Sequence, residues 1–301
     1  MKNITRLKWT VSLVIIAILS LPSTVMADEN LALYGLKGYA YTYSPLVVDG
    51  LHLQTGVMYS SFHGDNLFRD DNLNCRDGNI WAVPLSLTYG DGDWWEVSAA
   101  THWERWENTD FDVNENGIGD VFLGGKVRIL RQDKGSFVDV SVMPYALIST
   151  GDRDKSVGDL YRYSASDEDD PSYGGNLLLG KRWDRFYLTG NVGLHYVDTD
   201  EDDNEDEDAD NTTLFIGLTA EYQVSETVTT YAEFINKEHS NTTVYPESSP
   251  CYDEDSDEDI RELGIGVAWL KDQWGFKIHA GAGLTPTSPD VRVAALINLS
   301  F

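Results

Sequence analysis

The 301-residue sequence is poor in cysteine, in basic residues and in long apolar runs. Two cysteines, Cys75 and Cys251, are too few for a metal site built from four thiolates. Only 22 lysines and arginines stand against 50 aspartates and glutamates, a net charge of −28. Nucleic acid is therefore an implausible partner, because its phosphates would be repelled. An aromatic content of 12% also argues against a disordered acidic protein.

The first residues carry an export signal. Lys2, Arg6 and Lys8 precede an apolar run and the small-residue site "VMA" before Asp28. This pattern predicts a secretory signal peptide at residues 1–27. The apolar run is shorter than the roughly 20 residues that a membrane-spanning helix needs, and no later run approaches that length. Loss of the three basic residues takes the net charge of the exported chain to about −31.

Acidic residues gather in a few stretches, such as "VDTDEDDNEDEDADN" and "CYDEDSDEDI". Between these stretches, apolar and polar residues alternate over segments of about 10 to 13 residues, a length that lets a tilted strand cross a bilayer. The predicted strands lie near residues 51–62, 79–90, 93–105, 117–130, 135–149, 173–183, 185–197, 212–223, 227–237, 260–271, 274–284 and 290–301.

The connections between these strands alternate in length. Short ones such as "GDGD", "WDR" and "KDQ" follow the even-numbered strands up to the tenth, and long acidic ones follow the odd-numbered strands up to the ninth. This asymmetry is typical of outer-membrane barrels, whose turns face the periplasm. We therefore predict an all-β protein, a transmembrane antiparallel up-and-down β-barrel of about 12 strands at residues 51–301, with both termini periplasmic, in the Gram-negative outer membrane. A secreted β-sandwich would not explain the connection lengths.

The last segment, "VRVAALINLSF", is apolar at every odd position through Phe301. We expect Phe301 to act as the signal that the barrel assembly machinery recognises. Tryptophans near strand ends predict the two aromatic girdles of a membrane barrel. They are Trp94, Trp95, Trp103, Trp106, Trp183, Trp269 and Trp274.

Several stretches resemble a known family. They are "NGIGDVFLGGKVRIL" (116–130), "ALISTGD" (146–152), "GGNLLLGKRWDRFYLTGNVGLHY" (174–196) and "HAGAGLTPTSPDVRVAALINLSF" (279–301). They are similar to the outer-membrane family named for the MetA pathway of phenol degradation. The resemblance implies a transport barrel without catalytic residues. Two departures are Ser-Thr-Gly-Asp in place of Pro-Thr-Gly-Asp, and unusually long acidic loops.

Strand parity separates lipid-facing residues from inward-facing ones, and charged side chains must point inward because the lipid face would penalise them. The predicted lumen-lining residues are Glu96, His102, Asp120, Lys126, Arg128, Asp139, His195, Glu221, Glu233, Lys277, His279 and Arg292; His52, Gln54 and Asn191 share their parity. The sequence thus predicts a channel or transporter for small solutes with a mixed-charge lumen. Alternatively, these groups pair across a narrow lumen and close it. Residues 28–50 could fold into the lumen or lie at its periplasmic mouth.

The acidic loops admit three interpretations: a solvated surface, electrostatic selection of cations, or binding of Ca²⁺ that bridges to lipopolysaccharide. A closed structural or adhesive barrel with cation-binding loops is therefore the alternative function. We predict no other cofactor. Cys75 and Cys251 fall in long connections on the same face, which predicts a disulfide between them.

An outer-membrane phospholipase would carry its serine and histidine on the outer wall. Here His52, His102, His195 and His279 all have inward parity, and no Ser-Asn-Gly strand motif occurs. The sequence therefore predicts no enzyme.

Overall fold

The wall of the molecule is one antiparallel sheet. The computed structural model describes residues 30–62, 78–108, 113–152, 157–160, 171–196, 212–238, 259–285 and 287–301. Their strands are β1 (Asp49–Phe62), β2 (Gly78–Asp91), β3 (Trp95–Asn108), β4 (Val113–Ile118), β5 (Val121–Leu130), β6 (Asp139–Ile148), β7 (Ser172–Trp183), β8 (Phe186–Tyr196), β9 (Thr212–Gln223), β10 (Val228–Lys237), β11 (Ile260–Lys271), β12 (Trp274–Gly283) and β13 (Val291–Ser300).

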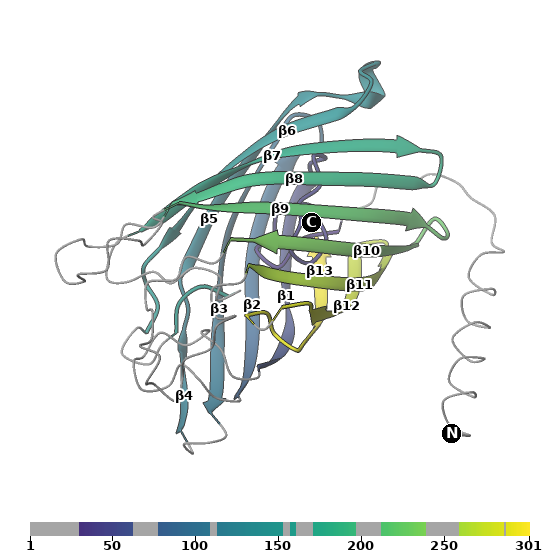
Figure 1. The fold of residues 1–301 in the computed structure, drawn as a ribbon. Helices are drawn as coiled ribbons and strands as arrows, with labels where there is room; N and C mark the ends of the chain where they lie inside the picture. The colour runs from purple at the N-terminus through teal and green to yellow at the C-terminus, as the bar shows by residue number, and fades with distance from the viewer. Residues whose placement is uncertain are drawn as a thin grey trace, which may run out of the picture.

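The sheet closes on itself into a barrel (Figure 1). Consecutive strands pair with each other except for β4 and β5, and β1 pairs with β13 as well as with β2. Both β4 and β5 pair with β3, because they are two halves of a single interrupted barrel strand. The thirteen segments therefore build a 12-stranded antiparallel barrel, which confirms the predicted fold class.

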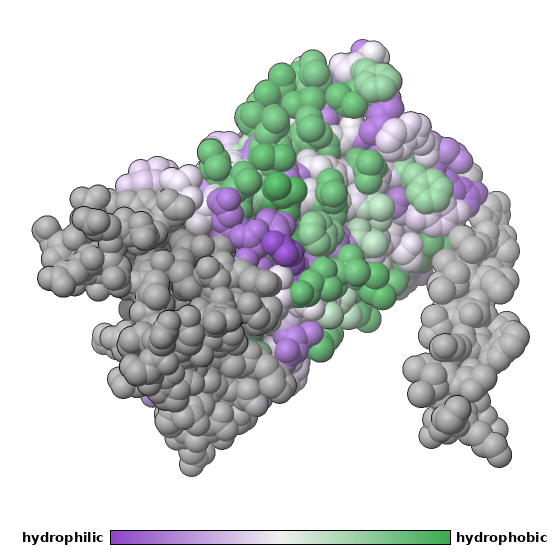
Figure 2. All heavy atoms as spheres, in the orientation of Figure 1, coloured by the Kyte–Doolittle hydropathy of each residue, from purple (hydrophilic) through white to green (hydrophobic). Residues whose placement is uncertain are grey.

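The two faces of the sheet differ in polarity, as strand alternation requires. On β8, the side chains of Leu188, Val192 and Leu194 are exposed, whereas Asn191 and His195 are buried. The same alternation runs through most strands, and apolar side chains gather over the outer wall in Figure 2. In a bilayer this exposed apolar surface faces the lipid chains, so the polar residues are left to the interior.

Three predictions about strands and connections are wrong. The predicted strand 117–130 is interrupted at Gly119 and Asp120, and the predicted long connection at 106–116 is mostly strand, since β3 continues to Asn108 and β4 begins at Val113. The strand predicted from residue 135 begins at Asp139 instead. A 3-10 turn precedes β6 and ends at Gly135, which has a φ of 95° that residues other than glycine rarely adopt. The chain therefore enters β6 only after this turn.

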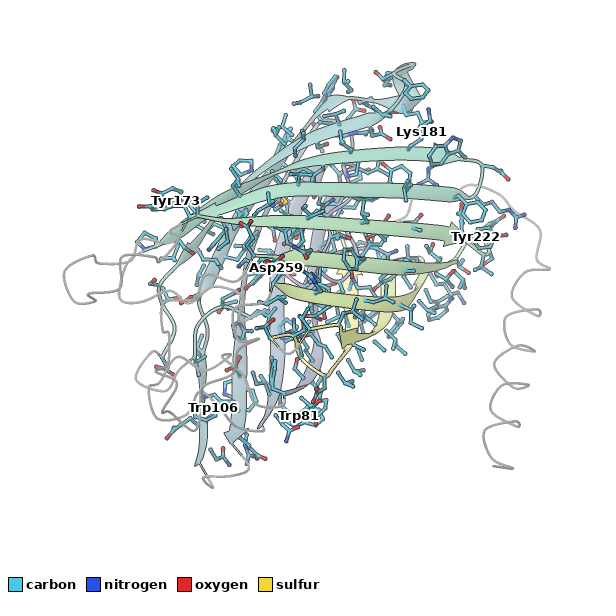
Figure 3. All side chains as sticks on the ribbon, viewed as in Figure 1. Trp81, Trp106, Tyr173, Lys181, Tyr222 and Asp259 are labelled. Atoms are coloured by element: carbon cyan, nitrogen blue, oxygen red, sulfur yellow. The ribbon has the colours of Figure 1, made fainter. Side chains whose placement is uncertain are left out.

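One girdle assignment is also wrong. Trp106 is 1% exposed and packs inside the barrel with Phe62, Ile80 and Val157, because its even position on β3 points inward. Trp81 and Trp103 take the lipid-facing places at that end of the barrel. Figure 3 shows Trp81, Trp106 and Tyr173 at the end with the long connections, and Lys181 and Tyr222 at the opposite rim, the short-turn end.

Some predictions fall outside the described residues. They are the signal peptide, Cys75, Cys251 and most of the acidic loops. In the part of the chain that the structure describes, no helix has the length and apolarity to cross a membrane.

Candidate functional site

A segment that precedes β1 fills much of the barrel interior. Residues 30–48, here called the lumen segment, fold into tight turns with bridges from Leu31 to Lys37 and from Gly38 to Tyr43. Almost all of its side chains are buried. In Figure 1 it lies in purple behind β8, β9 and β10, within the outline of the barrel. The lumen is therefore occupied by a separate piece of chain.

The first anchor of the lumen segment is the Glu96–Lys126 pair on β3 and β5. The Glu96 carboxylate accepts hydrogen bonds from the backbone N–H groups of Lys37 (2.8 Å) and Val48 (2.7 Å). Lys126 Nζ donates to Glu96 Oε1 (2.6 Å) and to the carbonyls of Lys37 (3.0 Å) and Leu46 (2.9 Å). The two charges are neighbours along the wall rather than partners across the lumen, and they bind the same segment.

The second anchor is Glu233 on β10. Its carboxylate accepts hydrogen bonds from the backbone N–H groups of Ala40 (3.3 Å), Tyr41 (3.0 Å) and Thr42 (2.6 Å), and from the Thr42 hydroxyl (2.7 Å). Because a buried N–H without an acceptor is costly, this carboxylate holds a turn that could not satisfy itself. Lys277 on β12 completes the anchor by donating to backbone carbonyls of the segment.

The other strands add neutral hydrogen bonds to the lumen segment. Asn191 both donates to the Tyr43 carbonyl (2.8 Å) and accepts from its N–H (2.7 Å). Gly35 has a φ of 92°, and a side chain there would meet Ser98 Oγ at 2.5 Å. This glycine therefore lets the segment lie against the wall. Burial raises the pKa of the Tyr41 hydroxyl well above its usual value, with Glu262 adding to the effect, so this group stays neutral.

All twelve predicted lumen-lining residues are at most 6% exposed. Those that bind the lumen segment are Glu96, Lys126, Glu221, Glu233 and Lys277. Arg128 and Asp139 pair with each other near the short-turn end, and Arg292 lies over the Tyr41 ring. His102 is near Glu104, whereas His195 and His279 each stack on a tyrosine. Phe301 is 69% exposed at the end of β13, and its role in assembly stays a prediction.

Asp120 holds a connection against the break between β4 and β5. Its Oδ1 accepts hydrogen bonds from the backbone N–H groups of Thr150 (3.2 Å) and Gly151 (3.0 Å), and its own N–H donates to the Gly158 carbonyl (3.0 Å). A side chain on Gly119 would lie 1.9 Å from His102, so only glycine permits this bend. The "NGIGD" and "STGD" motifs therefore meet here and direct residues 157–160 into the barrel.

Asp159, in this connection, borders a chamber on the long-connection side of the lumen segment. The chamber has a volume of about 70 Å³. Aromatic and aliphatic side chains form most of its wall, and Asp159, Asn176, His195 and Lys237 supply its polar groups. The Tyr34 hydroxyl donates to Asp159 and accepts from the N–H of Leu160 (2.9 Å). The lumen segment thus forms the floor of the chamber and is tied to its rim.

Among the strand residues that line the chamber, the sequence analysis assigned only His195 to the lumen. Large aromatic residues at inward parity, such as Phe122, Tyr145 and Phe215, were the available signal. Asp159 could not have been found by parity because it lies in a connection rather than in a strand. In the described residues, no group of three or more potential ligands is arranged to hold a metal ion. The predicted loop calcium site falls outside them.

A closed barrel with a lipid-facing apolar wall and a polar, filled interior defines an outer-membrane β-barrel protein. The chain belongs to the family of membrane bound beta barrel domains (DUF5777), which it matches over residues 77–285. This match does not confirm the MetA-pathway family that the sequence resembles. No curated protein sequence matches the chain.

Solved structures share the architecture. The COG4313 outer membrane channel from Pseudomonas putida F1 superposes with a TM-score of 0.63 at 11% identity, over 88% of this chain and 100% of that one. The NanC porin superposes with a TM-score of 0.50 at 12% identity, over 83% of this chain and 98% of that one. At such identities the likeness shows the fold alone.

Proposed function

We propose that this protein is an outer-membrane channel for small solutes that the lumen segment closes in the state described. The observation that carries the proposal is that wall charges bind a separate segment instead of closing the lumen among themselves. The carboxylates of Glu96 and Glu233 accept hydrogen bonds from backbone N–H groups of residues 30–48. When that segment moves away, a wall lined by both signs of charge remains, and water can satisfy it.

The likeness to an outer membrane channel and to a porin supports this proposal. The resemblance to the MetA-pathway family points the same way. We further propose that the long connections face outward and both termini face the periplasm, so that the chamber opens to the exterior. Lipopolysaccharide and the barrel assembly machinery are the partners that this placement implies.

The second candidate is a closed structural or adhesive barrel. The burial of the lumen segment favours it, because Leu31, Leu33 and Leu36 are each at most 1% exposed in the interior. In this case the segment is a permanent core and the loops carry the function. The two candidates differ in one property, which is whether the segment can leave its place.

A reversible crosslink tests that property. The hydroxyls of Thr42 and Thr219 on β9 are 2.5 Å apart. A Thr42→Cys, Thr219→Cys variant, in a background with Cys75→Ser and Cys251→Ser, should lock the segment to the wall when oxidised. We expect conductance in planar bilayers to be lost on oxidation and restored by reduction. A matched background without the two new cysteines controls for redox effects.

Deletion of residues 30–48 provides an independent test. We expect the deletion variant to show a larger and more persistent conductance than the full chain, because the wall groups become hydrated. Heat-modifiable electrophoretic mobility shows whether the shortened barrel is folded. Silent bilayers for the folded deletion variant, together with no redox response of the crosslinked one, would reject the channel in favour of the closed barrel.

A further inference from the structure

We infer that the chamber is a binding site for a small monocarboxylate with an apolar body. The inference rests on the proposed channel and specifies the class of its solute. The walls of the chamber are rings and aliphatic chains from both the barrel and the lumen segment, among them Tyr43, Phe122, Met143 and Phe215. Such walls favour the apolar part of a ligand, and the few polar groups fix its orientation.

Hydrogen-bond donors dominate the polar part of the chamber. Lys237 contributes an ammonium group and Asn176 a side-chain amide. The Tyr145 hydroxyl is 2.9 Å from His195 Nδ1 and can donate to it, which leaves the proton of the neutral ring on Nε2. That Nε2 is buried and has no hydrogen-bond partner among the described residues. A ligand that accepts hydrogen bonds matches this set.

The protein already places one carboxylate in this chamber. Asp159 reaches it from a connection, bonds to the Tyr34 hydroxyl and lies within electrostatic reach of Lys237. Its 6% exposure shows that the chamber accommodates a desolvated carboxylate. A solute carboxylate would share Lys237 with Asp159 or displace it, so the connection acts as an internal competitor for the site.

Size limits the solute further. The chamber volume is about 70 Å³, and one water molecule needs roughly 10 to 15 Å³ by this measure. About five waters, or a molecule of roughly six non-hydrogen atoms, therefore fit. The net negative charge of the chain does not decide the ligand, because exposed charges are screened over about 8 Å at physiological ionic strength. The groups that line the chamber decide it.

The test uses three probes with the same carbon skeleton: butyrate, 1-butanol and butylamine. Binding to the purified full-length barrel is measured by saturation-transfer NMR, without reference to conductance. We expect butyrate to bind at least about tenfold more tightly than 1-butanol or butylamine. The reason is that its carboxylate and the Lys237 ammonium, at contact distance, attract each other strongly at reduced dielectric. Equal binding of butyrate and 1-butanol, or tighter binding of butylamine, would overturn the inference.

Two variants make the test independent of folding. Lys237→Met should weaken butyrate binding by about tenfold or more, with Lys181→Met at the opposite rim as the matched control. Asp159→Asn should instead tighten butyrate binding by about fivefold to tenfold, since it removes a competing negative charge. A cation site would respond to Asp159→Asn in the opposite direction, and a weaker butyrate complex in that variant overturns the inference.

Binding and conductance separate the two proposals. If the crosslinked barrel responds to reduction but butyrate does not bind, the channel stands and the solute assignment fails. If butyrate binds with the expected variant pattern but no form of the barrel conducts, the site stands and the channel is rejected.

Discussion

The barrel contains two tyrosine–histidine pairs of nearly identical shape in different surroundings. Tyr145 and His195 stack with ring centroids 5.7 Å apart and an interplanar angle of 15°, and Tyr231 and His279 stack at 5.8 Å and 17°. In both pairs the hydroxyl approaches Nδ1, at 2.9 Å and 3.3 Å, and Nε2 has no hydrogen-bond partner in the described residues.

The lumen segment creates the difference between the pairs. Against His279 it places the Tyr41 ring edge-on at 5.2 Å, and Glu233 lies 3.9 Å from Nδ1. Against His195 it leaves a chamber. The Tyr231–His279 pair is thus packed against the lumen segment, whereas the Tyr145–His195 pair forms part of the wall of the candidate ligand site. The position of the lumen segment, and not the geometry of the pair itself, therefore decides whether such a pair is packed or borders a chamber.

The largest effect should come from removing the anchor that holds the lumen segment on the packed side, next to His279. Glu233→Ala removes the acceptor of three backbone N–H groups and one hydroxyl. We expect a loss of about 3 kcal/mol or more in the free energy of unfolding, because each buried donor left without a partner is costly. Urea unfolding in detergent, followed by tryptophan fluorescence, measures it. Glu238→Ala, at an exposed strand end, is the control and should change stability by less than about 1 kcal/mol.

A smaller effect should follow from loosening the chamber side. Asp120→Ala leaves the N–H groups of Thr150 and Gly151 without their acceptor, at a cost of about 2 kcal/mol. We expect it to tighten butyrate binding, because releasing residues 157–160 withdraws the competing Asp159 carboxylate, while amide exchange of the lumen segment stays slow. Asp120→Asn keeps one acceptor oxygen and should have the milder effect. Faster exchange throughout residues 30–48 would show that the two sides are not independent.

The last comparison is between the two histidines, and the smallest effect of all should be on the chamber side. His279→Phe inserts a larger ring where a side chain on Gly264 would already lie only 2.3 Å from His279, so we expect a loss of about 1 to 3 kcal/mol. His195→Phe removes a buried donor without a partner and also the acceptor of the Tyr145 hydroxyl. Because the adjacent chamber can take the extra volume and a water molecule for that hydroxyl, we expect a loss of only about 1 kcal/mol or less. Urea midpoints of the two variants measure the contrast, and equal losses would mean that the chamber side is as tightly packed as the other.

Strand pattern made most of the barrel predictable. Lipid on one face forces apolar residues to every second position, so segments such as 260–271 could be located to the residue. The interruption at Gly119 and Asp120 could not be predicted in this way. The alternating pattern of β5 gives no sign of it, and the bend depends on the fit between Gly119 and His102, a residue on another strand.

The candidate site was only partly predictable. Parity directed Glu96 and Glu233 inward, because a charge cannot face lipid cheaply. It did not show what they bind. The "LYGLKGYAYTY" stretch has no strand or helix period. Its backbone groups are satisfied by side chains that follow it by about 60 to 240 residues.

The sequence by itself determined the strands, their inward and outward faces and the sign of the charges inside, because these depend on one local rule, the cost of exposing polar groups to lipid. Only the tertiary structure decided which charges share a segment, where the lumen is filled and where a chamber remains. Those features depend on hydrogen bonds between residues far apart in the chain, such as Glu233 with Thr42 and Tyr34 with Asp159. Such pairings have no period that a sequence could display.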